Sequence, residues 1–501
     1  MTSNPVHRIG SSRSSDALLI GAFLIAFVSA LLLRVIFGYQ SLNPMLWALA
    51  VMLVALVRYE WKLNGHPLTP MGVLSIAGVV LFVMRPLAIQ SDRFTSAGAL
   101  ADSRSFTGAT ADAGVDATVE VVLFYAALSI AYFVLTTRRS RPAVVAPAEL
   151  TPDDRALARA GVIVWFTCLL AIVCIVLLVQ GSGGLSAHFA GLASRSSFIS
   201  GRYFLTLGYI PLSVALANYV LLRRRVPSIR RTWNSTATIS ALMLIASAFM
   251  TGARAPLLLG AIIPLLILKQ TGPKPVSNRG LVFAGLVMVV GALLVSLVFR
   301  ANVYDSGASV RQLEADPVGT LLSRVTSGSE TASFDSLILL NEVNNAGEMQ
   351  YQLGWTYATV PLWFVPGNLV PFDKGGANTW FTSNYLPRFY YPNKTETSIS
   401  AIGEAFANFG DFGVVILGLL LAVAASKIGL KRARGTTRQN LFAITLTPLF
   451  FSFLRGDSYQ NLSTVLLIAL LVWAVHALTK STSEIDSAPE LVPLSGLALR
   501  R

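Results

Sequence analysis

The feature that most constrains this chain is a series of apolar runs, each close to the length of a membrane-spanning helix. Such a helix needs roughly 20 apolar residues, and only 13% of the chain is charged, against about 25% in soluble domains. We therefore predict an all-α polytopic membrane protein with about 12 transmembrane helices. The predicted spans are 17–37, 43–57, 70–84, 118–136, 159–179, 203–222, 236–252, 255–269, 280–299, 411–426, 440–454 and 462–479.

The basic residues give these spans a direction. When alternate connections are placed in the cytoplasm, the clusters Arg138–Arg141, Arg223–Arg225 and Lys427–Arg438 all fall inside, as the positive-inside rule requires. The formal charge of +14 is thus a topology signal, and we expect no nucleic-acid partner. Both termini are predicted to be cytoplasmic, in a multi-pass protein of the cytoplasmic (inner) membrane.

The predicted organisation is dominated by one long outer connection. The spans divide the chain into five parts. These are a cytoplasmic tail (1–16), a transmembrane bundle of about nine helices (17–299), a large extracytoplasmic loop (300–410), the last three spans (411–479) and a second cytoplasmic tail (480–501). Loops of this length usually have a function or structure of their own. We expect short helices in it, including an amphipathic helix over 329–345, and we place the working surface outside.

Aromatic and polar residues alternate through the centre of this loop. Trp363 lies in a Pro-rich stretch, and Asp373 follows a few residues later. Rings beside carboxylates and amides suit a sugar, because the C–H faces of pyranoses pack on rings while the hydroxyls need polar partners. The alternative for any single ring is an aromatic belt at the membrane interface, with the loop lying on the bilayer.

The outside segments are rich in arginine and poor in lysine. Arginine offers a fixed fork of donors for phosphate and keeps its charge, so these residues are candidate ligands for a lipid-linked phosphate. Arg254, confined between two apolar runs, is the sharpest candidate; the alternative is a side chain that snorkels to the head groups. The outer arginines are Arg34, Arg85, Arg93, Arg104, Arg195, Arg202, Arg254, Arg300, Arg311, Arg324, Arg388 and Arg455.

Glu404 is the best candidate for a general base. It precedes a predicted span, near the outer surface, in a segment with Gly403, Asn408 and Gly410. Glycines there allow a ligand or backbone to come close, and a carboxylate can accept a proton from a substrate hydroxyl. The alternative is a polar contact that docks the loop on the bundle. The four histidines and two cysteines are scattered or lie in apolar sequence, so no metal site or cofactor is predicted.

Three segments resemble the bacterial O-antigen and oligosaccharide repeat-unit polymerases. They are Gly252-Ala253-Arg254, the loop pattern from Gly354 through Pro361-Leu-Trp363 and Pro371 to Ser400–Gly410, and Arg455-Gly456-Asp457. The whole hydropathy profile is also similar. The resemblance implies a GT-C-like membrane glycosyltransferase, or polysaccharide polymerase, with no nucleotide sugar and no obligatory metal.

The resemblance also implies the substrates. Such enzymes join undecaprenyl-pyrophosphate-linked oligosaccharide repeat units at the outer face of the membrane, and a chain-length regulator is among the partners it suggests, besides membrane lipid. The expected catalytic residues are Glu404 and Arg254. The expected substrate-binding residues are Arg195, Arg202, Arg300, Arg388, Arg455, Trp363, Asp373 and Asn408.

Two other functions stay open at this point. An O-antigen ligase, or another glycosyltransferase that uses lipid-linked sugars, would share the layout, although ligases of that kind use a histidine in the large outer loop and 300–410 contains none. A flippase or other transporter of lipid-linked oligosaccharides is the second. Transporters tend to place ionisable residues near the bilayer midplane, whereas here they gather at the ends of the spans.

Overall fold

The computed structural model describes most of the helical bundle and parts of segment 300–410, which we call the outer segment after its predicted side of the membrane. Of the described residues, 87% are helical and none forms a strand, so the all-α expectation is confirmed for them. The described residues are 42–64, 66–90, 111–137, 154–188, 202–226, 234–250, 280, 316, 332–365, 369–370, 375–387, 390–391, 396–434 and 437–480.

Among the residues that the structure describes, six helical stretches are long and apolar enough to cross a membrane. The second of them is continuous through three segments, α3 (Pro70–Gly78), a π-helical turn η2 (Val79–Val83) and α4 (Met84–Gln90). The other five belong to α2 (Leu42–Asn64), α5 (Ala111–Thr137), α6 (Asp154–Gly181), α18 (Ser400–Arg434) and α21 (Ser458–Thr479).

Three further predicted spans coincide with helices of a different character. The helix α8 (Arg202–Arg225) contains Pro211, and α9 (Ser235–Met250) is shorter than a full span. The predicted span 440–454 is two helices, α19 (Thr437–Leu446) and α20 (Leu449–Arg455), separated at Pro448, because proline cannot donate the backbone hydrogen bond that would continue a helix. Spans 17–37, 255–269 and 280–299 lie outside the described residues except for Gly280, so a total of about 12 stays a prediction.

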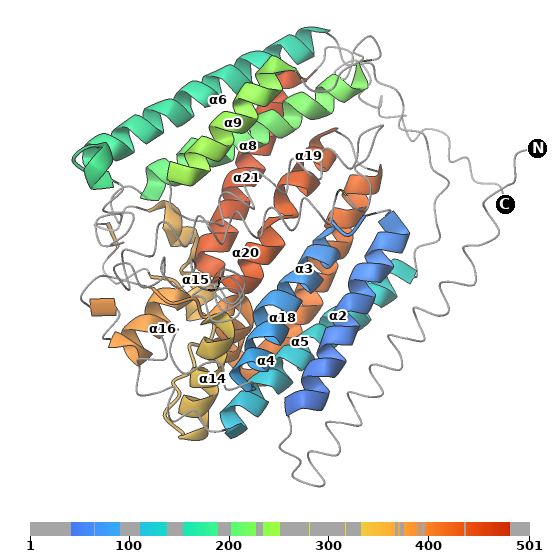
Figure 1. Cartoon of the computed structure of the whole chain (residues 1–501), viewed down its shortest axis with the longest axis vertical. Helices are drawn as coiled ribbons and strands as arrows, with labels where there is room; N and C mark the ends of the chain where they lie inside the picture. Colours follow the sequence, from blue (N-terminus) through green and yellow to red (C-terminus); the bar gives the residue numbers. More distant parts are fainter. Residues whose placement is uncertain are drawn as a thin grey trace, which may run out of the picture.

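The helices pack around two hydrophobic clusters. One contains buried residues of α2, α3, α5, α18 and α20 and extends into the outer segment. The other joins α6, α8, α9, α19 and α21, and Ile428 of α18 packs against both. In Figure 1 the second group forms the upper part of the bundle, and the short helices of the outer segment lie at its lower left end.

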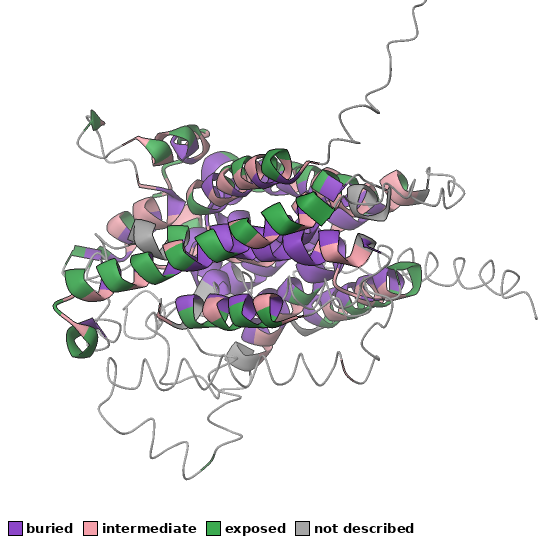
Figure 2. Cartoon of the chain, turned by 90° about the horizontal axis from the view of Figure 1, so that it is seen from above, coloured by how far each residue is buried: buried purple, intermediate pink, exposed green. Residues whose placement is uncertain are grey.

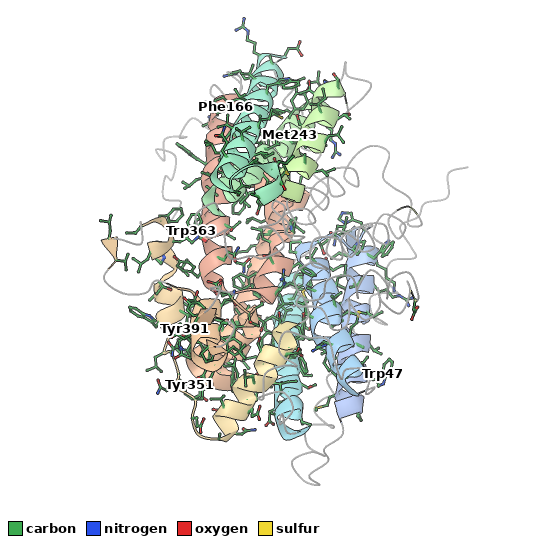
Figure 3. The ribbon with its side chains drawn as sticks, turned by 60° about the vertical axis from the view of Figure 1, so that its left-hand side comes forward. Trp47, Phe166, Met243, Tyr351, Trp363 and Tyr391 are labelled. Atoms are coloured by element: carbon green, nitrogen blue, oxygen red, sulfur yellow. The ribbon has the colours of Figure 1, made fainter. Side chains whose placement is uncertain are left out.

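Apolar side chains also cover the outward faces of the long helices. On α6 they include Val162, Phe166, Leu169 and Val173, while Val164, Cys168 and Ala171 are buried. Figure 2 shows the same division, with buried faces turned inward and exposed faces outward, and Figure 3 shows Phe166 and Trp47 at the periphery. Because large exposed apolar faces are rare on soluble proteins, we conclude that this is a membrane protein.

Contacts between helix ends agree with antiparallel alternation. At one end, Asn345 of the outer segment donates to Asp116 at the start of α5 (3.1 Å). At the other, Tyr132 late in α5 donates to Glu60 late in α2 (2.8 Å), and Arg159 donates to the carbonyl of Lys480 (3.0 Å). The ends that the basic residues assign to the cytoplasm therefore lie together, although the direction relative to a membrane stays a prediction.

Candidate functional site

The described part of the predicted loop folds into short helices on one end of the bundle. They are α14 (Ala332–Asn345), α15 (Trp355–Ala358), the 3-10 helix η4 (Val360–Phe364) and α16 (Ala377–Tyr385). The expected short helices, including that over 329–345, are thus present. The helix α18 begins at Ser400, before the predicted span, and is broken at Phe409 and Gly410, so a helical turn of the loop runs directly into the span.

Glu404 lies where this segment meets the bundle. It is fully buried. Its Oε1 accepts a hydrogen bond from the hydroxyl of Thr356 (2.8 Å) and its Oε2 accepts one from the backbone N–H of Ser458 (2.6 Å), and the side chain of Ser458 is also hydrogen-bonded to this carboxyl group. Ser458 is the first residue of α21, where backbone N–H groups lack partners within the helix and a negative charge is stabilised. Glu404 therefore joins α15, α18 and the start of α21.

Asn408 completes this contact one turn further along α18. Its side-chain N–H₂ group donates to Thr356 Oγ1 (2.8 Å) and to the carbonyl of Glu404 (2.7 Å), and its oxygen accepts from the N–H of Gly354 (2.8 Å). Asn408 and Thr356 are both buried. The two residues expected from the sequence, Glu404 and Asn408, are thus brought together through a threonine that the sequence did not single out.

A second carboxylate, Asp457, lies next to Ser458. Its Oδ1 accepts from the N–H of Gln460 and caps α21 (3.1 Å), and its Oδ2 accepts from the N–H of Asn378 near the start of α16 (3.0 Å). One side chain therefore serves the N-termini of two helices. Asp457 followed by Gln460 is a form of the capping-box pattern, which was visible in the sequence. We call Glu404, Asn408, Thr356, Asp457 and Ser458 the carboxylate junction.

Arg455 stands directly before this junction, at the end of α20. Its side chain is half-buried, and its carbonyl accepts hydrogen bonds from the hydroxyls of Ser333 and Ser398. The backbone of Arg455 is thereby fixed by the outer segment from two directions. Arg455 is thus the last residue of α20, two residues before Asp457 in the connection to α21.

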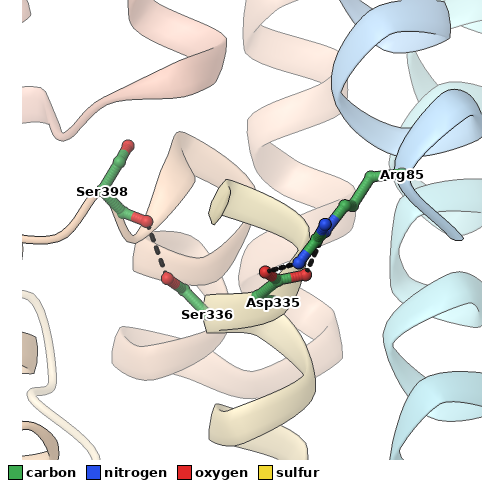
Figure 4. Close-up of polar contacts among 4 residues, drawn as sticks. All are labelled: Arg85, Asp335, Ser336 and Ser398. Carbon is green, nitrogen blue, oxygen red and sulfur yellow. Dashed lines mark hydrogen bonds and ion pairs between the residues drawn. The ribbon is translucent and has the colours of Figure 1, made fainter. Parts of the chain in front are cut away.

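The beginning of α14 ties the outer segment to α20 and α4, and also to a later part of the same segment. Ser333 bonds the carbonyl of Arg455, and Ser336 bonds the carbonyl of Ser398 (2.8 Å). Between them, Asp335 accepts from two nitrogens of Arg85, one of them Nε at 2.8 Å. Figure 4 shows this pair and the Ser336–Ser398 contact. Arg85, one of the twelve outer arginines, is buried and bound to a carboxylate of its own chain.

Burial and charge act in opposite directions on Asp335. Loss of water raises the pKa of its carboxyl above the ordinary value, while the guanidinium of Arg85 lowers it; bidentate pairing of this kind favours the ionised form. Tyr357 in α15 has a pKa well above its usual range, first because it is buried and then because the carboxyl of Glu404 is near. Its hydroxyl therefore stays protonated.

The aromatic residues of the loop divide into packed and exposed ones. Trp363 is half-buried in η4 and meets Phe364 edge-on, with ring centroids 5.0 Å apart. Phe381 is fully buried, while Trp355 and Tyr391 are largely exposed. Figure 3 places Trp363, Tyr391 and Tyr351 along one side of the molecule, from about its middle toward its lower end.

The remaining expected residues lie beyond what the structure describes. Arg202 begins α8, but its side chain is not described, and the others fall outside the described ranges. These others are Arg195, Arg254, Arg300, Asp373 and Arg388. In the described portion of the chain, no three His, Cys, Asp or Glu residues are grouped so that they could hold a metal ion.

No family model matches this sequence, and comparison with curated proteins and with solved structures finds no match either. The chemistry of the site thus has to be judged from its geometry. It offers two carboxylates, an amide and a neighbouring arginine where a folded outer segment meets the ends of α18, α20 and α21.

Proposed function

We propose that the protein is an inner-membrane polymerase that joins undecaprenyl-pyrophosphate-linked oligosaccharide repeat units at the outer face of the membrane. The main support is the position of the carboxylate junction. A long segment between two spans folds back as helices. Glu404 and Asn408 are hydrogen-bonded to Thr356 of this segment, and the backbone carbonyl of Arg455 accepts from its Ser333. This is a suitable place to bring together a lipid-held leaving group and a sugar hydroxyl.

The proposed reaction is a glycosyl transfer between two lipid-linked substrates. A hydroxyl oxygen of the incoming repeat unit attacks the anomeric carbon of the growing chain, and the bond from that carbon to the pyrophosphate oxygen breaks. The hydroxyl proton passes to the carboxylate of Glu404. The departing undecaprenyl pyrophosphate keeps the electron pair and is stabilised by arginines, with Arg254 as the main group and Arg300 and Arg455 as helpers.

The enclosed position of Glu404 makes the base role demanding. Glu404 is fully buried and both of its oxygens already accept hydrogen bonds, so an acceptor hydroxyl can reach Oε1 only if the contact with Thr356 moves. Glu404 can therefore have one of two roles: a general base that takes a proton, or a structural residue that holds α15 against α21 by hydrogen bonds. Replacing the carboxylate by an amide distinguishes the two roles, because an amide can still accept a hydrogen bond but cannot take a proton.

The test is complementation of a gene deletion, with the polysaccharide ladder and the amount of membrane-inserted protein measured together. Glu404→Gln keeps the shape and can still accept the bond from Ser458, but it cannot take a proton. We expect a normal amount of protein and single repeat units in place of the ladder. Thr356→Val is the matched control, because it removes the hydroxyl contact and keeps the carboxylate; it should lower stability and keep the ladder.

Several outcomes would contradict the proposal. A full ladder with Glu404→Gln would exclude the base role, and a full ladder with Arg254→Ala would exclude the phosphate role. Purified protein with lipid-linked units in detergent should make longer products. Failure there, with transport of the same units in vesicles, would identify a flippase; transfer only to a lipid A-core acceptor would identify a ligase.

A further inference from the structure

The break in α18 brings two stretches of chain together at the outer end of that helix. Phe409 and Gly410 leave helical geometry, and the segment that precedes α15 lies along them. The N–H of Gln352 donates to the carbonyl of Ala407 (2.9 Å), and a side chain on Gly354 would touch the ring of Phe409. Five large side chains on these two stretches are exposed, and we call them the kink surface: Tyr351, Leu353, Trp355, Phe409 and Phe412.

Leu353 occupies an unusual position on this surface. It lies in a tight turn that is closed by the N–H of Trp355 and the carbonyl of Gln352 (2.8 Å). Both central residues, Leu353 and Gly354, have positive φ angles, 46° and 89°. Turns of this kind favour Asn-Gly, because a side chain such as leucine is strained at positive φ.

The side chain of Leu353 is also 79% exposed. In water this position would therefore combine a strained backbone with an unprotected apolar side chain, and an asparagine would relieve both. In a lipid environment the same side chain gains from its exposure. The residue is thus better explained by an apolar surrounding than by an aqueous loop.

The position of the kink along α18 matches the boundary of a bilayer. At a rise of about 1.5 Å per residue, the helix from Asp411 to Lys431 spans about 30 Å, which is the thickness of the hydrocarbon core. The basic end of the helix begins at Lys427, about 24 Å from Asp411 by the same rise, and continues with Lys431 and Arg432, whose long side chains can reach the head groups from within the hydrocarbon boundary. The exposed residues Phe412, Ile416 and Leu420 continue down one face, so the kink surface is the outer end of a face that contacts lipid.

We propose that the kink surface is inserted into the outer leaflet of the membrane, so that the corner at 351–355 is an interfacial anchor and not an aqueous loop. The partner is the acyl region of the leaflet just below the head groups, where tryptophan and tyrosine are favoured. Since Trp355 is followed directly by Thr356, the anchor holds the carboxylate junction at the membrane surface. This inference does not depend on glycosyl transfer.

The test measures the depth of a spin label in lipid nanodiscs. The only two cysteines, Cys168 and Cys174, are buried in α6, so alanine at both gives a cysteine-free background. Single cysteines are then placed at Leu353, at Leu420 in the lipid-facing stripe, and at Glu348, an exposed polar residue of the same segment. Collision with oxygen, which concentrates in lipid, is compared with collision with a water-soluble nickel chelate.

We expect the label at 353 to collide more often with oxygen than with nickel, as at 420, and the label at 348 to do the reverse. An aqueous result at 353 would overturn the proposal. So would protection from both reagents, because the surface would then be covered by protein. Phe412→Cys provides a second site on ordinary helical backbone, where the same result is required.

A substitution separates lipid contact from folding. Leu353→Asn suits the turn better than leucine and removes the apolar group, so the thermal stability of the purified protein in detergent should be unchanged or higher. In nanodiscs, a label at position 355 should become more accessible to nickel when Leu353 is replaced. Unchanged accessibility there would count against an anchor at Leu353.

Discussion

The buried pair of Arg85 and Asp335 gives the sharpest quantitative prediction. It joins α4 to α14, and the exposures of the two side chains are only 7% and 2%. We consider three variants: Arg85→Met, Asp335→Leu, and the two together. Each single change removes one charge and leaves its partner buried.

The expected magnitudes follow from that burial. Removing one partner of a buried pair costs about 3–5 kcal/mol, because the remaining charge has no counter-charge and its hydrogen-bond partners are lost. Replacing both by apolar residues of similar volume is often neutral or stabilising. The double variant should therefore recover most of the loss, with a coupling energy of about 3 kcal/mol or more, well above the additivity error for independent sites.

The assay is thermal unfolding of the purified protein in one detergent, followed by intrinsic fluorescence at a fixed scan rate. Fixed conditions matter because unfolding of large proteins is often irreversible. Arg159→Met is the matched control: Arg159 is exposed and donates to a backbone carbonyl, so its loss should cost within about 0.5 kcal/mol. If Arg85→Met behaves like Arg159→Met, or if the double variant is as unstable as the sum of the singles, the reasoning is wrong.

Three further predictions concern packing and use the same unfolding assay. Gly418→Ala should destabilise the folded protein by about 1–3 kcal/mol through overpacking, because the new methyl group would lie 2.6 Å from the carbonyl oxygen of Phe124. Gly429→Ala is the control in the same helix. It has open space around it and should be neutral or stabilising by up to about 1 kcal/mol. Gly410→Ala should lower stability by about 1–3 kcal/mol, since its φ of 61° and ψ of −154° suit only glycine. Tyr125→Phe should cost about 1 kcal/mol by removing a buried hydrogen bond to α3. The packing described would be contradicted if Gly418→Ala were as stable as Gly429→Ala, or if Gly410→Ala or Tyr125→Phe were as stable as the unchanged protein.

The helices were predictable because hydropathy is a local property. Whether a run of about 20 residues is apolar enough to form a buried or lipid-facing helix can be judged from those residues alone. The breaks were harder to place. Pro448 divides a run that reads as one span, and the left-handed turn at Gly410 lies inside a helix that continues on both sides. Both depend on single residues that a window of about 20 residues averages away.

The partners of polar residues could not be predicted in the same way. Glu404 and Asn408 were identifiable as polar residues among glycines before a span, but Thr356 lies 48 positions from Glu404 and Ser458 lies 54 positions away. Arg85 is paired with a residue 250 positions away. Nothing local in the sequence distinguishes Thr356 from other threonines, so these contacts required the structure.

The fate of Arg85 also changes how the outer arginines should be interpreted. From the sequence they form one group, because they belong to the predicted outside segments, several of them lie at the ends of apolar runs, and each could bind phosphate or head groups. Arg85 differs from a phosphate ligand because its guanidinium already donates to Asp335 in a buried site. Displacing Asp335 would leave that carboxylate buried without its counter-charge. Arg455 differs in the opposite sense, since it is fixed through its backbone carbonyl while its side chain is only half-buried. Burial thus separates an arginine that holds the outer segment in place from one that could respond to a substrate, and the same physical criterion applies to Arg254 and Arg300.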